Sequence, residues 1–166
     1  MNYIFELANL ADVPAAYALI AKRVNWMEDN GIKQWNTTDY LNVYPLPYFE
    51  SHQENGRLYK MSEETSGKLV GVMVLLDNDP RWPGNNLTDS YFVHNFATDP
   101  SINGLGSLML LEAEQLSISH GKTYLRLDCP SHSLILNRYY ETRGYIHVGE
   151  CVDGAYSGNL REKKLI

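Results

Sequence analysis

The residues with the clearest potential for chemistry form a glycine-containing turn between a predicted strand and a predicted helix. The strand is predicted to end near Thr98, the helix to begin near Gly106, and the turn reads Ser101-Ile102-Asn103-Gly104-Leu105-Gly106-Ser107. Glycine lets the backbone approach a ligand closely, and the free N–H groups of a helix N-terminus carry partial positive charge. The turn therefore suits a phosphate or pyrophosphate group. A tight turn that binds no ligand is the alternative.

Other motifs for nucleotide or metal binding are not found. No Gly-Lys-Ser/Thr follows the turn, and the third glycine of a dinucleotide-binding fingerprint would fall at Met109. Asp77-Asn78-Asp79 begins like a calcium loop, but Pro80 and Arg81 follow where further ligands are needed, so we interpret it as a turn. We expect no metal, because no metal-ligand spacing is seen among His52, His120, His132 and His147.

Alternating strands and helices are predicted to position this turn. A first strand is expected at Tyr3–Leu7, followed by a helix that Asp12 caps and that ends at Asn30-Gly31. A short helix is expected from about Pro47 to before Gly56, and a later one at 133–143. Strands are expected at 58–62, 68–76, 91–98, 123–128, 145–151 and 160–165. This order predicts one α/β (α+β) domain over residues 1–166 with a mixed sheet.

Composition and charge limit the partners and the compartment. The chain has 166 residues, 44% of them hydrophobic, and a net charge of −6, so it shows no basic face for nucleic acid and favours a cationic partner. No apolar run approaches the ~18 residues of a membrane helix, and no basic segment opens the N-terminus as in a signal peptide. Cys129 and Cys151 form no CxxC and are expected to be reduced. We therefore predict a cytoplasmic protein that binds neither nucleic acid nor membrane.

Later segments match a known family. The turn at Ser101–Gly106 aligns with the coenzyme-A loop Gln/Arg-x-x-Gly-x-Gly/Ala, and residues 133–145 align with Asn-x-x-Leu-x-x-Tyr-Tyr-Glu-x-x-Gly-Phe. Together with Gly31-Ile32-Lys33-Gln34-Trp35, a segment seen in bacterial members, the whole chain resembles the GNAT (Gcn5-related) N-acetyltransferases. The resemblance implies a mixed, mostly antiparallel, twisted sheet of about seven strands, splayed at its centre and flanked by about four helices.

The resemblance implies acetyl-CoA as co-substrate and no metal. It places coenzyme contacts on the loop residues Ser101, Ile102, Asn103, Gly104, Leu105, Gly106 and Ser107, on the backbone of Phe96, Ala97 and Thr98, and on Ser133. Two positions depart from the family pattern. Ser101 stands where the family has Gln or Arg, and Ser133 stands where many members carry an Asn that contacts the pantetheine arm.

The resemblance also assigns candidate catalytic groups. The backbone N–H of Phe96 is expected to polarise the thioester carbonyl, and Tyr140 aligns with the general acid that protonates the leaving thiolate. His94 lies two residues before Phe96, on the same face of a regular strand, and a histidine suits a base there because its ordinary pKa is ~6.5. The alternatives are that Tyr139 and Tyr140 only pack, and that His94 is structural.

The acceptor is expected to be an amine. Trp26 and Trp35 lie in segments that line the acceptor side in the resembling family, and aromatic rings with nearby carboxylates can bind a cation. Packing of these aromatic side chains in the core is the alternative. The predicted function is direct acetyl transfer to a primary amine, a small amine or amino-sugar being favoured. The alternatives are acetylation of a protein N-terminus or lysine, and a non-catalytic coenzyme-A-binding module. A homodimer is possible, since dimers are common in the family.

Overall fold

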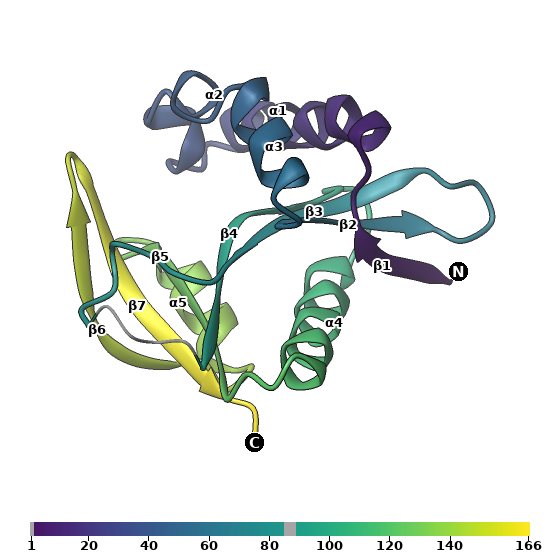
Figure 1. Cartoon of the computed structure of the whole chain (residues 1–166). Coiled ribbons are helices and arrows are strands. Elements are labelled where there is room, and N and C mark those ends of the chain that lie inside the picture. The colour runs from purple at the N-terminus through teal and green to yellow at the C-terminus, as the bar shows by residue number, and fades with distance from the viewer. Residues whose placement is uncertain (1, 85–88) are drawn as a thin grey trace. The chain divides into compact units, whose positions relative to one another are not determined.

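The seven strands form one sheet in the order β1-β2-β3-β4-β5-β7-β6. The computed structural model (Figure 1) describes residues 2–84 and 89–166. The strands are β1 (Tyr3–Leu7), β2 (Leu58–Glu63), β3 (Leu69–Leu76), β4 (Ser90–Thr98), β5 (Tyr124–Pro130), β6 (Ile146–Asp153) and β7 (Tyr156–Lys164). Of the strand pairs whose register is described, β4 and β5 are parallel and the others antiparallel. The predicted mixed, mostly antiparallel sheet is confirmed.

The described residues contain five α-helices, where about four were expected. They are α1 (Val13–Asp29), α2 (Tyr40–Val43), α3 (Leu46–Glu54), α4 (Leu105–Ser119) and α5 (Leu134–Glu141), and short 3-10 turns lie at Leu10–Asp12 and Trp35–Thr37. The additional helix is α2, which has only four residues. A single turn of helix leaves no repeated apolar spacing in the sequence, so periodicity did not reveal it. No helix in the described part of the chain is both long and apolar enough to cross a membrane.

The chain divides into two compact units. Unit 1 comprises residues 1–75 and 95–112, and unit 2 comprises residues 76–94 and 113–166. Strand β4 and helix α4 each contribute residues to both units. The expectation of a single domain over 1–166 stays a prediction.

Unit 1 is a small sheet covered by helices on both faces. Figure 1 shows α1 and α3 on one face of the β1–β3 sheet and the N-terminal part of α4 on the other. Phe49 of α3 and Ile20 of α1 are fully buried. Gly71 of β3 permits the approach of α4, because a Cβ at this position would lie 2.6 Å from Sδ of Met109. Close packing therefore requires glycine here, and it holds the start of α4 against the sheet.

The start of α1 differs from the sequence prediction. Asp12 was expected to cap this helix, but its side chain makes no capping bond to α1. Instead, Asn9 and Asp12 form a reciprocal capping box around the preceding 3-10 turn, and the Asp12 carboxylate also pairs with Lys60 at 2.8 Å. A capping side chain accepts from an N–H two or three residues later, and the extra turn moves that role upstream. Gly31, with φ of +66°, follows the helix as expected.

Unit 2 is built around β5. Residues 90–93 of β4 pair in parallel with residues 124–127 of β5, and β7 pairs antiparallel with the other edge of β5 and with β6. Helix α5 packs against β5. The fully buried Tyr145 donates its hydroxyl hydrogen bond to Glu114, at 2.9 Å. Arg126 is also buried and donates to Glu162 at 2.9 Å, so the ionic groups of this core are paired.

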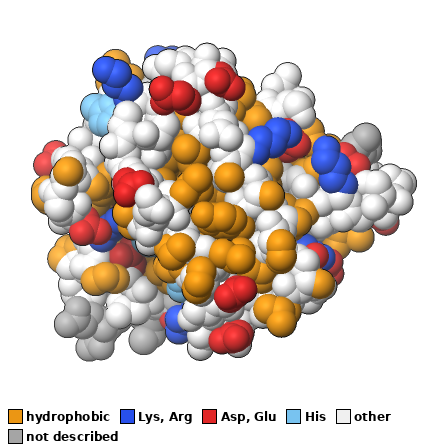
Figure 2. Space-filling model, turned by 90° about the horizontal axis from the view of Figure 1, so that it is seen from above, with side chains coloured by type: hydrophobic (Ala, Val, Ile, Leu, Met, Phe, Trp, Pro, Cys, Tyr) orange, Lys and Arg blue, Asp and Glu red, His pale blue; other side chains and the backbone are white. Residues whose placement is uncertain are grey.

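Charged side chains of both signs are mixed on the face of the protein shown in Figure 2. On the face shown in Figure 2, the described Lys and Arg side chains lie singly, with Asp and Glu side chains among them. This distribution agrees with the net charge of −6 and the absence of a basic stripe in the sequence. Phosphate neutralisation by clustered basic residues supplies most of the affinity of nucleic-acid binders. No such cluster of basic side chains is seen among the described residues on the face in Figure 2.

Candidate active site

The glycine turn of unit 1 begins at a buried aspartate. Asp99 is 2% exposed, and its carboxylate accepts hydrogen bonds from the backbone N–H of Ser101 at 3.0 Å and from the Ser101 hydroxyl at 2.7 Å. Lys22 of α1 donates to both carboxylate oxygens, at 2.9 and 2.8 Å. Burial alone raises the pKa of Asp99, but these bonds and the charge of Lys22 outweigh it and hold the pKa well below its usual range. Asp99 is therefore an anion that anchors the turn to α1.

The backbone after Ser101 presents a run of hydrogen-bond donors. Gly104 has φ of +80°, in the left-handed region that favours glycine. The N–H groups of Asn103, Gly104, Leu105 and Gly106 have no acceptor within the described residues, whereas Ile102 and Ser107 donate to Asp99 and Gly104 carbonyls. Asn103 and Gly104 are exposed. Four consecutive donors at the N-terminus of the fifteen-residue helix α4 fit the phosphates that the sequence predicts.

Strand β4 is irregular beside the predicted oxyanion donor. Asn95 has φ of +49° and is 6% exposed. Its side chain accepts from the Tyr48 hydroxyl at 2.8 Å and donates to the Tyr40 hydroxyl at 2.7 Å. The alternation that predicts His94 and Phe96 on one face is therefore interrupted at Asn95. Two tyrosines hold this left-handed residue, which sequence reasoning did not identify, immediately before the backbone N–H of Phe96.

The two tryptophans predicted to bind the acceptor occupy different places in unit 1. Trp35 is half-buried and stacks on Tyr40, with ring centroids 4.2 Å apart. Trp26 lines a groove of about 480 Å³ on α1, together with Asp29 and Pro100. The guanidinium of Arg23 lies 4.3 Å from the centre of the Trp26 ring. Trp26 thus lies at the surface of α1 with Arg23 over its ring, whereas Trp35 supports the tyrosine that contacts Asn95.

In unit 2, Tyr140 is held by aromatic neighbours rather than by its hydroxyl. Its ring makes edge contacts with Tyr139 and Tyr145, at centroid distances of 5.2 and 5.9 Å. No hydrogen bond of the Tyr140 hydroxyl is found among the residues that the structure describes. Burial, with smaller contributions from Cys129 and Tyr139, raises the pKa of Tyr140. The hydroxyl therefore stays protonated at neutral pH, as a proton donor requires.

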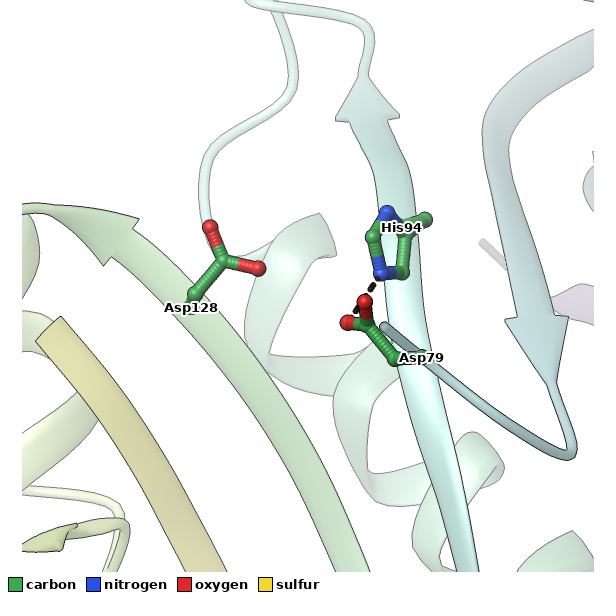
Figure 3. Close-up of side chains that lie close together, drawn as sticks. All are labelled: Asp79, His94 and Asp128. Carbon is green, nitrogen blue, oxygen red and sulfur yellow. Dashed lines mark hydrogen bonds and ion pairs between the residues drawn. The ribbon is translucent and has the colours of Figure 1, made fainter. Parts of the chain in front are cut away.

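His94 lies beside a buried carboxylate that sequence reasoning interpreted as part of a turn. Its Nε2 is 2.7 Å from Oδ2 of Asp79, which is 2% exposed, and Asp128 lies near both (Figure 3). The three residues offer ligand atoms within 4.8 Å of one another. Asp79 follows Asp77 and Asn78 in an acidic segment, so nothing in the sequence distinguishes it from exposed neighbours.

The side chains of Ser133 and Asn137 form hydrogen bonds that hold α5 in place. The Ser133 hydroxyl, predicted to contact coenzyme, accepts from the backbone N–H of Leu136 and caps α5. Asn137 accepts from Asn159 and Arg161 and donates to the carbonyl of Pro130, so it links α5 to β5 and β7. Burial raises the pKa of the Cys129 thiol to about 11, which keeps the thiol protonated, and Cys129 is a free cysteine.

Known proteins share this sequence pattern and fold. The family model for the acetyltransferase (GNAT) family matches residues 16–145. The uncharacterized N-acetyltransferase YesJ of Bacillus subtilis (strain 168) is 25% identical over 161 residues, which cover 93% of this chain and 86% of YesJ.

Solved structures of acetyltransferases share the fold of this chain. An acetyltransferase of the GNAT family from Listeria monocytogenes 4b F2365 superposes with a TM-score of 0.80 at 23% identity, covering 98% of this chain and 94% of that one. The PaiA N-acetyltransferase of Thermoplasma acidophilum, in complex with coenzyme A, superposes with a TM-score of 0.73 at 16% identity, over 99% of both chains.

The chain belongs to the GNAT acetyltransferase family, since the family model covers well over half of it. The family resemblance, the fold class and the enzyme class predicted from the sequence are confirmed. The GNAT fold binds acetyl-CoA, and one structural relative contains coenzyme A. The roles of individual residues are predictions, developed below.

We expect Asp99→Ala to weaken acetyl-CoA binding about tenfold, because the turn loses two of its hydrogen bonds and each typically contributes ~0.5–1.5 kcal/mol. Isothermal titration calorimetry measures this change in affinity.

The wild type should also be more stable than Asp99→Ala above pH ~3.9, the ordinary pKa of an aspartate in the unfolded chain, because folding lowers the pKa of Asp99. That difference should shrink as the pH falls below this value. Lys68→Ala is the control, since exposed Lys68 lies 3.7 Å from Asp99 and such pairs contribute little. An equal loss of affinity in both variants would contradict the anchoring role.

Proposed function

We propose that this acetyltransferase moves the acetyl group of acetyl-CoA directly to a primary amine of a small molecule, such as an alkyl amine or an amino-sugar. Binding of acetyl-CoA is supported by four consecutive backbone N–H groups, at residues 103–106, that have no acceptor among the described residues. A pyrophosphate accepts from such a run. Acetyl-CoA, when bound, supplies the thioester whose carbonyl carbon the amine attacks.

The protein's own groups handle charge and protons in this proposal. The backbone N–H of Phe96 donates to the thioester oxygen, where negative charge develops, and the backbone of Ala97 and Thr98, with Ser133, contacts the pantetheine arm. The acceptor ammonium loses one proton to solvent to become the neutral amine, and His94 accepts the second proton that the nitrogen loses as the C–N bond forms. Tyr140 donates its proton to the sulfur as the C–S bond breaks, and solvent then restores both groups.

A small cationic acceptor is supported by the groove on α1. Trp26 provides an aromatic wall and Asp29 a carboxylate, a combination that attracts an ammonium group. The net charge of −6 favours a cation over an anion in the same way. Lys22, which also lines this groove, is already paired with Asp99 at 2.8 Å, so its charge opposes an incoming ammonium less than a free lysine would.

The test combines a binding assay with a substrate panel. Acetyl-CoA and coenzyme A should each raise the melting temperature. Thiol release should then occur with some members of a panel of alkyl amines, polyamines and amino-sugars, and not with peptides carrying a free N-terminus or an internal lysine. Faster turnover of a peptide than of every small amine would overturn the proposed acceptor class. Coenzyme binding without thiol release from any amine would contradict the transfer.

We expect Trp26→Ala to raise the KM of the best small amine about 3- to 30-fold, since a cation–aromatic contact contributes ~0.5–2 kcal/mol. The KM of acetyl-CoA should change less than twofold. Steady-state kinetics with each substrate varied in turn measure the two values. Trp26→Phe keeps an aromatic face and should recover most of the amine affinity. A parallel rise in both KM values would indicate that Trp26 only packs on α1.

A further inference from the structure

The geometry points to Asp79 as a positioning residue that holds His94 with its proton on Nε2 and leaves Nδ1 as the basic nitrogen. This inference rests on the proposed function, because it concerns the histidine that accepts the amine's proton. It adds a residue that the sequence patterns did not connect with catalysis, and it names the nitrogen atom that acts. Because Asp79 is ionisable and lies beside the proposed base, its substitution should change how kcat/KM depends on pH.

Both oxygens of the Asp79 carboxylate already have partners. Oδ1 accepts from the backbone N–H of Arg81 at 2.9 Å, and Oδ2 lies 2.7 Å from Nε2 of His94. The side chain of Asp79 is 2% exposed and that of His94 is 13% exposed. The carboxylate therefore has a fixed orientation, set by a backbone group on one side and by the imidazole on the other.

The charge of Asp79 determines the tautomer of His94. Burial alone raises the pKa of Asp79, but the hydrogen bond and charge of His94 and the contacts with Arg81 outweigh it, and the pKa lies below its usual range. An ionised carboxylate only accepts hydrogen bonds. Nε2 of His94 must therefore carry a hydrogen, and the neutral ring keeps its lone pair on Nδ1.

The second ring nitrogen is available for chemistry. Nδ1 points away from the Asp79 carboxylate in Figure 3, and no hydrogen bond to it is found within residues 2–84 and 89–166. In the proposed step Nδ1 takes the proton of the amine, which gives an imidazolium with hydrogens on both nitrogens. The negative charge of Asp79 stabilises that imidazolium, as in other histidines backed by a carboxylate.

Of the two carboxylates in this cluster, Asp79 is the one that contacts the His94 imidazole, and Asp128 is paired with Arg81. Asp128 accepts from the Arg81 guanidinium at 3.3 Å and from the Tyr156 hydroxyl at 2.5 Å. Arg81 thus compensates Asp128, whereas Asp79 faces the imidazole. Because Arg81 supplies a cation to the same cluster, we infer a hydrogen-bonded pair here rather than a metal site.

The remaining groups near the pair do not add charge at neutral pH. Burial raises the pKa of the Cys151 thiol to about 11, and burial together with Asp128 raises the pKa of Tyr156. Both side chains are therefore neutral. Asp153, which is exposed, pairs with Arg81 at 3.0 Å. The charged neighbours of the His94–Asp79 pair are accordingly Asp128 and Arg81.

Asp79→Asn is the most informative substitution, because the hydrogen bond from the Arg81 backbone fixes which way the new side-chain amide points. Its carbonyl must continue to accept from the buried N–H of Arg81, so its NH₂ group faces Nε2 of His94. Nε2 then has to accept, and the proton of the neutral ring moves to Nδ1. We expect kcat to fall by at least about 10- to 100-fold, because the wrong tautomer of a histidine base backed by a carboxylate can lower kcat by up to about 10⁴-fold. The acetyl-CoA Kd should change less than twofold.

The tautomer is read directly by two-bond ¹H–¹⁵N correlation spectra of the ¹⁵N-histidine-labelled, EDTA-treated full chain. The His94 signals are assigned by their loss in His94→Gln. The wild type should show hydrogen on Nε2 and Asp79→Asn hydrogen on Nδ1. The acidic limb of kcat/KM should also move to lower pH in Asp79→Asn, because an anion no longer favours the imidazolium. Asp77→Asn, at an exposed carboxylate two residues away, is the matched control and should change neither.

The outcomes separate this inference from the proposed function. If His94 carries its hydrogen on Nδ1 in the wild type, or keeps it on Nε2 in Asp79→Asn, the positioning role is wrong even though His94→Ala abolishes the acidic limb. If the tautomer inverts but kcat does not change, the positioning of the ring is correct and His94 is not the base. If one equivalent of Zn²⁺ shifts the His94 nitrogens and EDTA reverses it, the cluster is a metal site and the inference is overturned.

Discussion

Tyr140→Phe is expected to lower kcat by about 10²- to 10⁴-fold, the usual contribution of a general acid or base, while the acetyl-CoA Kd changes no more than a few-fold. The substitution removes a hydroxyl that makes no hydrogen bond in the described chain. It keeps a ring packed edge-on against Tyr139 and Tyr145. Because folding does not depend on this hydroxyl, its loss should affect the chemical step and little else.

Single-turnover kinetics with saturating acetyl-CoA measure the chemical step, and calorimetry measures the Kd. Tyr139→Phe is the matched control, since it removes the neighbouring hydroxyl from the same helix and should retain nearly full kcat. The thermal midpoint of Tyr140→Phe should stay close to that of the wild type. An unchanged kcat in Tyr140→Phe would remove this tyrosine from the mechanism and leave it a packing residue.

Gly104→Val is expected to weaken acetyl-CoA binding at least about a hundredfold. A Cβ at Gly104 would meet nothing within 4 Å, so the cause is not a clash inside the protein. Its φ of +80° is the problem, because a β-branched residue avoids this region and the turn must change conformation. The donors at residues 103–106 then no longer converge, and each charge-assisted hydrogen bond lost removes ~1.5–3 kcal/mol.

Gly67→Val provides the comparison. Gly67 lies in the turn between β2 and β3 and has φ of +68°, and a Cβ added there would likewise meet nothing within 4 Å. The two substitutions therefore impose a similar backbone strain in the same unit. Both should lower the thermal midpoint, and only Gly104→Val should lose coenzyme in calorimetry. Normal binding by Gly104→Val would show that the turn at 101–107 is not the coenzyme loop.

Local patterns predicted the elements well because each depends on neighbouring residues. The expected first strand, Tyr3–Leu7, agrees with β1, and the helix expected to begin near Gly106 agrees with α4 at Leu105–Ser119. The glycine turn is also local, since φ at Gly104 and the donors of the following helix are properties of seven adjacent residues. Element type and the coenzyme turn could therefore be predicted before any tertiary contact was known.

Side-chain partners far apart in the chain could not be predicted in this way. Asn95 meets hydroxyls 47 and 55 residues away, and Asp99 meets Lys22 across 77 residues. The sequence shows these residues as ordinary polar positions. Asp99 anchors the turn, and Asn95 is held by two tyrosines, only because folding brings these distant partners within hydrogen-bond distance.

Contiguous motifs were enough to predict the family and the order of most elements. They also led to the predictions, still untested, that the turn at 101–107 binds coenzyme and that His94 and Tyr140 transfer protons. Asp79 lies in a turn, as expected, and its carbonyl accepts from the backbone N–H of Trp82 at 3.0 Å. Its buried position beside the imidazole of His94, 15 residues away, depends on the tertiary fold. A carboxylate enters a core only where hydrogen bonds and charge compensate its lost hydration. Those partners, the Arg81 backbone and His94, become neighbours of Asp79 only through the fold.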